Sequence, residues 1–380
     1  MIKFKISAPG RIILSGDHTV TFGNHFVVAG LDLRTNLEFC ELSDEQTNIR
    51  IEFQDYEKDV PLQEVQCLSS RLIRENLFSD QVNLLKEVNS FINVNNMWEK
   101  TEQKISLLML FFLLCTVTYK EHLVIKPFRL HVSTEIPFEN GLGGSTSFVV
   151  CLAACFLHWK RLQSGVHIRF NEQDLEKIEE YTRSCEGILQ KDALATIDAK
   201  VCVYGRINKC KHIHSNVYDM KCIDVVKTGI KILLIGTHLC LTEAQRYKQI
   251  ADLMLSRSNF NSIFNELDEI AINIFDDLNY INNNIENSDA YNDLQRDIKK
   301  NQQMLSKYDL SYFEFDIVSC LGSGFNLAGK LTGFKGSYVY FPLPPKITKE
   351  EITRITNLFS YRKCSYKIAT IGCDGVRIDI

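Results

Sequence analysis

The sequence predicts a mixed α/β fold, with β-strands and amphipathic helices arranged in two domains that are in close contact. Its 380 residues exceed what one hydrophobic core usually holds. Segments with the alternation of a strand and segments with helical spacing follow one another along the chain. A glycine-rich stretch at residues 141–144 separates an expected strand from an expected helix. These three observations favour two adjoining α/β domains.

The first part of the chain is predicted to contain short strands. Alternating apolar residues indicate four of them before residue 40, at residues 2–7, 11–14, 25–29 and 33–39. We expect a turn at Pro9-Gly10 between the first two strands, because both residue types favour turns. Residues 55–100 are polar with weak periodicity, so short helices and loops are expected there.

Ile105–Val117 is the most apolar run of the chain. Two interpretations apply, a membrane span and a buried helix. A span needs about 20 apolar residues, and Lys104 and Lys120 bracket this run closely. We therefore favour the buried helix and expect no membrane partner.

The remaining elements alternate between helices and strands. A strand at residues 128–135 leads through the glycine-rich stretch into an apolar helix at 145–162. The later elements are a polar helix at 172–189, a strand at 231–236, a helical region at 243–310, strands at 327–332 and 337–341, a helix at 349–360, and two strands around Gly372 within 366–380.

Composition and charge narrow the class of protein. The chain is 45% apolar and 24% charged, and its net charge of −4 gives no electrostatic reason to bind nucleic acid or an anionic membrane. Its 13 cysteines are odd in number and follow no paired spacing, which favours free thiols in a reducing compartment. The N-terminus alternates like a strand and lacks the apolar core of a signal peptide. We expect a cytoplasmic protein.

The segment Pro137-Phe-Glu-Asn-Gly141-Leu-Gly143-Gly144-Ser145-Thr146-Ser147 contains the clearest functional signal. Glycines between a strand and a helix leave amide N–H groups free to face a phosphate, and the helix N-terminus adds partial positive charge. The Ser145 hydroxyl is suited to a metal ion on such phosphates. The alternative is a simple helix cap, in which Ser145 or Thr146 binds first-turn amides. No Lys follows the glycines, so the segment is not a P-loop.

Several motifs together resemble the mevalonate kinase family of the galactokinase, homoserine kinase, mevalonate kinase and phosphomevalonate kinase (GHMP) superfamily. Pro-x-x-x-Gly-Leu-Gly-x-Ser is similar to the second motif of that superfamily. The N-terminal motif of the family is matched by Ser7-Ala-Pro-Gly10-Arg11-Ile-Ile-Leu-Ser-Gly16-Asp17-His18. Segments in the family's order follow at Leu33-Arg34-Thr35, Asn301-Gln302, Lys330-Leu331-Thr332-Gly333 and Ile371-Gly372-x-x-Gly375-Val376. The resemblance spans nearly the whole chain.

The resemblance implies a specific fold and assembly. It implies a ribosomal-protein-S5-domain-2-like N-terminal domain at residues 1–228, a ferredoxin-like C-terminal domain at residues 229–380, and an active site in the cleft between them. Because members of the family often form homodimers, it implies a homodimer. Some members are inhibited by prenyl diphosphates at the ATP site, and the resemblance extends this inhibition to the present chain.

The resemblance also assigns the catalytic acid. In the family, a helical Glu precedes an Asp by about eleven residues, and an aromatic-Gly pair follows that Asp six and seven positions on. Tyr204-Gly205 stands at that offset from Asp198, so Asp198 is the match and Asp192 the competitor. Glu186 is the matching Glu, with one residue inserted. Glu186 and Ser145 would then hold Mg²⁺, and Asp198 would accept or orient the substrate hydroxyl proton.

The remaining implied contacts divide between substrate and nucleotide. Arg11 stands where the family has Lys, near the transferred phosphoryl group and the catalytic Asp; it retains the charge but has a planar, forked head. His18, with Asp17 beside it, matches a substrate-contacting position, and Thr237 matches a threonine near the substrate. For His18 the alternative is a buried histidine satisfied by backbone groups. The nucleotide positions are Asn140, Gly141, Leu142, Gly143, Gly144, Ser145, Thr146, Gly333 and Lys335.

The chain departs from the family in three places. Lys191–Thr196 replaces the family's His-Gly-x-Pro-Ser-Gly before the catalytic Asp. Phe334 and Lys335 interrupt the glycine run of the third motif, where Phe334 lacks the freedom of glycine and Lys335 adds a compensating charge. Glu139 places an anion in the phosphate loop, which disfavours bound phosphate.

One further cluster has two interpretations. Cys210, His212, His214 and Cys222 are soft metal ligands, but they lack paired C-x-x-C spacing. We interpret them as part of a surface strand and turn rather than as a metal site.

The function implied by the resemblance is ATP-dependent phosphorylation of the C5 hydroxyl of mevalonate, with Mg²⁺ as cofactor. Two alternatives stay open. The first is a kinase of the same superfamily that phosphorylates another small alcohol. The second is a catalytically weak relative that binds ligands or protein partners without turnover.

Overall fold

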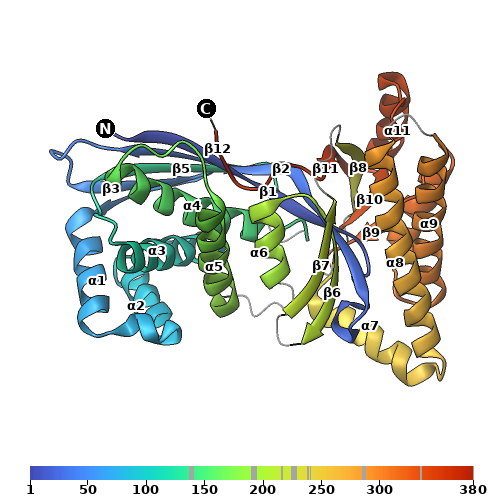
Figure 1. Cartoon of the computed structure of the whole chain (residues 1–380), viewed down its shortest axis with the longest axis horizontal. Helices are drawn as coiled ribbons and strands as arrows, with labels where there is room; N and C mark the ends of the chain where they lie inside the picture. Colours follow the sequence, from blue (N-terminus) through green and yellow to red (C-terminus); the bar gives the residue numbers. More distant parts are fainter. Residues whose placement is uncertain are drawn as a thin grey trace.

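The computed structural model describes residues 1–136, 141–189, 195–214, 217–223, 229–237, 239, 241–284, 288–333 and 336–379. Within these residues the chain forms a mixed α/β structure around one twelve-stranded sheet. Figure 1 shows this sheet running along the molecule, with one group of helices below its N-terminal half and a second group beside its other end. The predicted α/β class is confirmed.

Two long antiparallel strands form the spine of the sheet. β1 (Lys3–Ser15) and β2 (His25–Glu41) pair from Lys3 opposite Cys40 to Ser15 opposite Val27. The turn predicted at Pro9-Gly10 is wrong: the strand continues through it with a register shift between these two residues. Pro9 lies opposite Arg34 and Gly10 opposite Leu31, so the extra residues of the bulge, Asp32 and Leu33, are on β2. The ladder is thus interrupted next to Pro9, which has no N–H to donate to it. The two short strands expected at 25–39 are likewise one strand.

The other strands attach to both ends of this spine. The main path is β4-β3-β5-β2-β11-β8-β10-β9, with β12 on β1 and the hairpin β6-β7 on β2. Most pairs are antiparallel, and β3 and β5 run parallel. The bounds are β3 (Asn48–Phe53), β4 (Tyr56–Pro61), β5 (Phe128–Thr134), β6 (Ile207–His214), β7 (Val217–Ile223), β8 (Ile230–Gly236), β9 (Lys330–Thr332), β10 (Tyr338–Pro342), β11 (Ser365–Ile371) and β12 (Arg377–Asp379).

Helices pack on the sheet in two groups. The N-terminal group comprises α1 (Leu62–Arg74), α2 (Gln81–Val94), α3 (Thr101–Glu121), α4 (Gly144–Ser164), α5 (Glu172–Leu189) and α6 (Ala195–Tyr204). The C-terminal group comprises α7 (Glu243–Ser256), α8 (Phe260–Asn283), α9 (Ser288–Lys307), α10 (Phe313–Ser323) and α11 (Lys349–Tyr361). Short 3₁₀ turns occur at Val20–Phe22 and Leu77–Ser79. The helices predicted at 145–162, 172–189 and 349–360 are confirmed.

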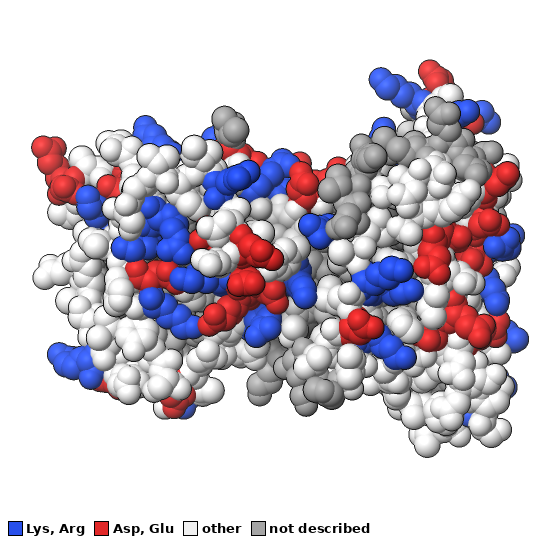
Figure 2. Space-filling model, viewed as in Figure 1, with Lys and Arg blue, Asp and Glu red and all other residues white. Residues whose placement is uncertain are grey.

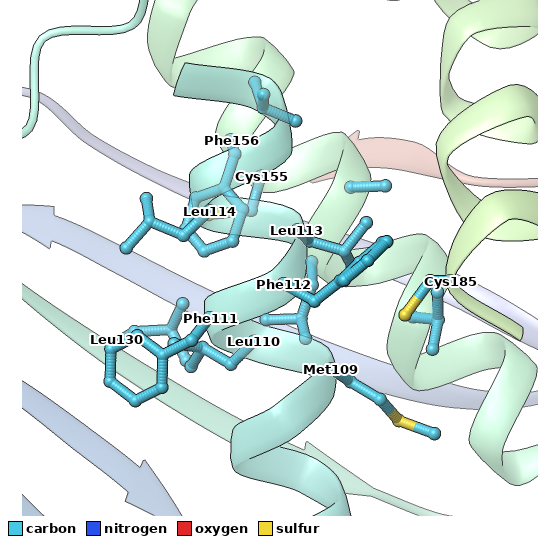
Figure 3. Packing of buried hydrophobic residues seen from close by; sticks show 14 of the residues in the cluster. Met109, Leu110, Phe111, Phe112, Leu113, Leu114, Leu130, Cys155, Phe156 and Cys185 are labelled. Atoms are coloured by element: carbon cyan, nitrogen blue, oxygen red, sulfur yellow. The ribbon is translucent and has the colours of Figure 1, made fainter. Parts of the chain in front are cut away.

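Helix α3 forms the centre of the N-terminal core. It is long and apolar enough to cross a membrane by length and composition alone. Every residue from 106 to 117 is nevertheless buried in the protein. Figure 3 shows side chains from Met109 to Leu114 packed among Phe156 and Cys155, with Leu130 and Cys185 close by. The interpretation as a buried core helix is therefore confirmed.

A second core lies between the C-terminal helices and the other end of the sheet. It joins the apolar faces of α8 and α9 to β8 and β10, and it includes Ile12, Leu14 and Val27 from the spine. Because β1 and β2 contribute side chains to both cores, the spine itself joins the two halves. The domain boundary expected after residue 228 falls at the end of residues 224–228, which lie outside the described part of the chain.

Charges of both signs are interleaved on the surface. Figure 2 shows basic and acidic side chains lying next to one another on the visible face, above all over the N-terminal half. Among the described residues, the exposed strand residues form cross-strand ion pairs, such as Lys5 with Glu38 at 2.5 Å and Arg129 with Glu52 at 2.7 Å.

Candidate active site

The glycine-rich loop lies in sequence between β5 and helix α4, as predicted, and its described residues contact β1 of the spine. Arg11 of β1 donates its backbone N–H to the carbonyl oxygen of Leu142 at 2.9 Å. Gly143 precedes the helix with φ of +75°, and a Cβ atom there would lie 2.7 Å from Cγ of Arg11. A side chain at this position would be strained and would collide with Arg11. The loop therefore approaches β1 closely because residue 143 is glycine.

Arg11 and Asp198 form a buried, two-pronged ion pair. Nε of Arg11 donates to Oδ1 of Asp198 at 2.7 Å, and Nη2 donates to Oδ2 at 2.5 Å. The third guanidinium nitrogen, Nη1, donates to the carbonyl oxygen of Gly141 at 2.8 Å. Arg11 is only 6% exposed and Asp198 only 5%. One side chain thus links β1, the phosphate loop and α6.

Helix α6 explains how Asp198 reaches this position. Asp198 lies in the first turn of α6, where a carboxylate is favoured by the helix dipole. The neighbouring Ile197 and Val201 are buried in a small core with Ile13 and Val28 of the spine. This packing orients α6 against β1. The competing Asp192 lies outside the described residues.

Glu186 lies next to the start of α4. Oε1 of Glu186 accepts a hydrogen bond from the Thr146 hydroxyl at 2.6 Å, and Glu186 is 2% exposed. The Thr146 side chain therefore does not cap helix α4, and the alternative in which it does is wrong. The half-buried Ser145 is the preceding residue. Carboxylate and hydroxyl oxygens are hard ligands of the kind Mg²⁺ takes, so the chemistry of these side chains fits the implied ion.

No described cluster of three or more Cys, His, Asp or Glu side chains is arranged to hold a metal ion by itself. Cys210 is fully buried in β6, whereas Cys222 is exposed on β7 and faces Asn208 across the hairpin. The side chain of His214 lies outside the described part of the chain. Cys210 and Cys222 thus lie in a strand hairpin, as expected, but Cys210 is buried rather than at the surface.

His18 lies in a buried cluster of charged side chains at the end of β1. Its Nε2 lies 3.0 Å from Nη1 of Arg246 in α7, and its Nδ1 lies 3.5 Å from Oδ1 of Asp17. Asp17 also accepts from Nζ of Lys330 in β9 at 3.0 Å. The side-chain partners contradict the alternative of a histidine satisfied by backbone groups. Sequence reasoning did not single out Arg246, and it used Lys330 only as part of a motif.

Burial and charge set the protonation of this cluster. Burial lowers the pKa of His18, and the Coulomb and hydrogen-bond attraction of Asp17 does not offset it. Burial alone would raise the pKa of Asp17, but Lys330 and its other neighbours outweigh burial and hold that pKa far below its usual range. Near neutral pH the histidine is therefore neutral and the aspartate ionised. Because Nη1 of Arg246 is a donor, Nε2 of His18 is the acceptor and its proton is on Nδ1.

The third motif lies against the phosphate loop. Thr332 of β9 donates its hydroxyl to the carbonyl oxygen of Ile13 at 2.7 Å. Gly333 follows with φ of +84°, and a Cβ atom there would lie 3.1 Å from the carbonyl oxygen of Gly141. The motif and the loop are thus adjacent. Asn140 and Lys335 of the implied nucleotide site lie outside the described residues, as do Glu139 and Phe334.

Thr237 has a structural role in the described part of the chain. Its hydroxyl makes hydrogen bonds to the carbonyl oxygens of Ser337 at 3.1 Å and Leu239 at 3.2 Å. No described contact joins it to Asp198 or His18. Its assignment to the substrate stays a prediction.

A cavity that sequence reasoning missed lies beside the start of α4. It has a volume of about 230 Å³. Apolar walls come from Phe53, Tyr56 and Phe148, and Gly144 lines it as well. The rings of Phe53 and Tyr56 stack with centroids 5.9 Å apart. In the sequence, this cavity is indicated only by two aromatic residues at the β3–β4 turn. They form a cavity wall only because the fold brings them next to α4.

Comparisons with known proteins agree with this arrangement. Residues 111–206 match the model of the GHMP kinases N terminal domain. Mevalonate kinase of Arabidopsis thaliana is 25% identical over 401 residues, covering 99% of this chain and all of the relative. That of Dictyostelium discoideum is 22% identical over 409 residues, covering 99% and 96%.

Solved structures show the same fold. Mevalonate kinase of Methanococcus jannaschii superposes with a TM-score of 0.68 at 19% identity, covering 98% of this chain and 99% of that one. Mevalonate kinase of L. major, solved with R-mevalonate, superposes with a TM-score of 0.62 at 14% identity, covering 99% and 97%.

The fold and the glycine-rich loop are thus similar to those of the small-molecule kinases of the GHMP class. Within that class the chain is a divergent relative of the mevalonate kinases, which it resembles along nearly its whole length.

Proposed function

We propose that this chain is a mevalonate kinase, which transfers the γ-phosphoryl group of ATP to the C5 hydroxyl of mevalonate and forms 5-phosphomevalonate. The observation that carries the proposal is the buried pair of Arg11 and Asp198, which joins the phosphate loop to α6. A carboxylate, a cation and a helix N-terminus at one place are the groups that phosphoryl transfer to an alcohol needs.

The residues of this chain have separate roles in the proposed reaction. The amides at the start of α4 bind the nucleotide phosphates, as the helix dipole favours. Asp198 orients the C5 hydroxyl and accepts its proton as the oxygen attacks. Arg11 fixes the Asp198 carboxylate and places positive charge beside the loop, so that both groups are positioned before the substrates bind.

Ser145 and Glu186 are the side chains that we propose to hold Mg²⁺. Bound there, the ion neutralises charge on the nucleotide phosphates. Glu186 is already fixed by the Thr146 hydroxyl at 2.6 Å. That hydrogen bond orients the carboxylate, so Thr146 acts through Glu186.

The cavity next to α4 is suited to the nucleoside part of ATP. Adenine is flat and apolar on its faces, and Phe53, Tyr56 and Phe148 supply matching walls. Gly144 lines the same cavity, so a base bound there has its phosphates directed to the phosphate loop. Lys100 and Gln103 lie at its polar side.

The proposal is tested by measuring ADP release with mevalonate, homoserine and galactose as acceptors, and by identifying the product by ³¹P NMR. Mevalonate should be the preferred acceptor and a phosphomonoester the product. A preference for another alcohol would change the proposed substrate but leave the proposed kinase activity in place. If a thermal-shift titration shows no ATP binding and no ATP is turned over, the chain is better explained as a non-catalytic relative.

We extend the proposal to assembly and regulation on the strength of the resemblance. The chain then acts in the cytoplasm as a homodimer and is inhibited by prenyl diphosphates. Light scattering coupled to gel filtration tests the dimer. Farnesyl diphosphate should raise the KM for ATP without lowering kcat, whereas an unchanged KM for ATP would exclude competition at the nucleotide site.

The altered third motif yields a prediction about nucleotide affinity. Phe334→Gly should tighten binding of a non-hydrolysable ATP analogue, because glycine lets the loop approach the phosphates, and Lys335→Ala should weaken it by removing a charge. Each change should be about 1 kcal/mol, the size of one modest contact. Calorimetric titration measures both, and mevalonate affinity serves as the control. If neither substitution changes the nucleotide affinity, this loop is not part of the ATP site.

A further inference from the structure

Arg246 is a buried arginine whose hydrogen-bonding capacity is only partly used. It is 1% exposed and lies in the first turns of α7. Nη1 contacts Nε2 of His18 and the carbonyl oxygen of Leu310, both at 3.0 Å. Nε and Nη2 have no hydrogen-bond partner among the described residues. Buried charged donors without partners are costly, so such a group indicates a ligand.

The two unused donors lie on one edge of the guanidinium group. Nε–H and Nη2–H point in parallel, which matches the two oxygens of a carboxylate. Arg11 shows the same edge in use, because its Nε and Nη2 bind the two oxygens of Asp198 at 2.7 and 2.5 Å. Among the described residues no carboxylate fills this place at Arg246.

The surrounding charges also favour an anion. The cluster contains two cations, Arg246 and Lys330, and one carboxylate, Asp17, which accepts from Lys330. His18 is neutral, as derived above from its burial. The cluster therefore has one excess positive charge in a place from which water is largely excluded, where an opposite charge is strongly attracted.

The cluster is connected to the catalytic pair through β1. Arg11 lies on this strand, and Asp17 and His18 follow its end. Thr332, two residues after Lys330, is hydrogen-bonded to Ile13 of the same strand. A substrate with its hydroxyl at Asp198 thus has the cluster as the next charged site along the spine.

We propose that Arg246 binds the carboxylate of the substrate through Nε and Nη2, and that it thereby selects hydroxy acids over neutral alcohols. The inference rests on the proposed function and adds the residue that recognises the acid end of the substrate. His18 positions Arg246 by accepting from Nη1, which leaves the opposite edge directed to the ligand.

The test compares mevalonate with 3-methylpentane-1,3,5-triol, in which the carboxylate is replaced by a neutral CH₂OH group. Calorimetry on the full chain should find mevalonate bound about 10- to 100-fold more tightly, as expected for a charge-assisted bidentate contact. Arg246→Met should remove this difference by weakening mevalonate alone. Arg246→Lys, which retains the charge but not the fork, should lie between.

Kinetics separate recognition from a general defect. Arg246→Met should raise the KM for mevalonate by the same factor and leave kcat and the KM for ATP nearly unchanged. Lys248→Met is the matched control, since Lys248 is an exposed cation on the same helix, and it should change none of these values. Melting curves establish that each variant is folded.

The outcomes distinguish the inference from the function on which it rests. If Arg246→Met binds mevalonate as tightly as the unmodified protein does, the inference is overturned and the proposed mevalonate kinase function stands. Equal affinity of the unmodified protein for mevalonate and the triol would do the same, even if the methionine variant does not fold. An unmodified protein that binds ATP but not mevalonate would overturn both.

Discussion

Asp198→Asn is expected to lower kcat by about 10²–10⁴-fold, the usual contribution of one positioned acid–base group. Asparagine has nearly the same shape but cannot accept the proton of the C5 hydroxyl. ATP affinity should stay nearly unchanged, because the phosphates are bound by the loop and by the start of α4. Steady-state kinetics with mevalonate, combined with calorimetry for an ATP analogue, measure the two effects separately.

Asp192→Asn is the control for this assignment, because Asp192 competes for the same role in the sequence. It should leave kcat close to that of the unmodified protein. A crippled Asp192→Asn together with an active Asp198→Asn would mean that the family motif had been matched with the wrong spacing. Melting curves are needed for both variants, since Asp198→Asn also removes the charge that faces buried Arg11.

The fold class and most helices could be predicted from the sequence because their signals are local. The apolar run of α3 and the amphipathic, helical spacing of α5 each indicate a helix without knowledge of the rest of the chain. The continuity of β1 could not be predicted in this way. Pro9-Gly10 favours a turn locally, and only the pairing with twelve residues of β2 carries the strand through it.

The candidate site divides in the same manner. The phosphate loop lies within one short segment, and Asp198 has a fixed offset from Tyr204-Gly205, so sequence reasoning could find both. Arg246 is far from His18 in sequence, and its amphipathic helix gives no sign that an arginine points inward. The cavity lined by Phe53 and Phe148 likewise depends on β3 and α4 being packed together. Contacts of this kind follow from tertiary packing, which no local pattern encodes.

Arg11→Met is expected to cost both stability and activity, because it leaves the buried carboxylate of Asp198 without its cation. Breaking a buried ion pair from one side typically lowers the free energy of unfolding by about 3–5 kcal/mol. Turnover should fall by about 10²–10³-fold, because the carboxylate loses its orientation and the loop loses the hydrogen bond to Gly141. Urea denaturation and steady-state kinetics measure the two losses.

Arg11→Lys and the double variant Arg11→Met/Asp198→Asn show whether the pair acts as a unit. Lysine retains the charge and one hydrogen bond but not the fork, so turnover should fall only about 10-fold and stability by about 1–2 kcal/mol. The double variant should recover about 2 kcal/mol relative to Arg11→Met, since the buried carboxylate that lost its Arg11 partner is gone, and it should stay inactive. Strictly additive losses of stability would show that the two side chains are not coupled, and an active double variant would remove both from the mechanism.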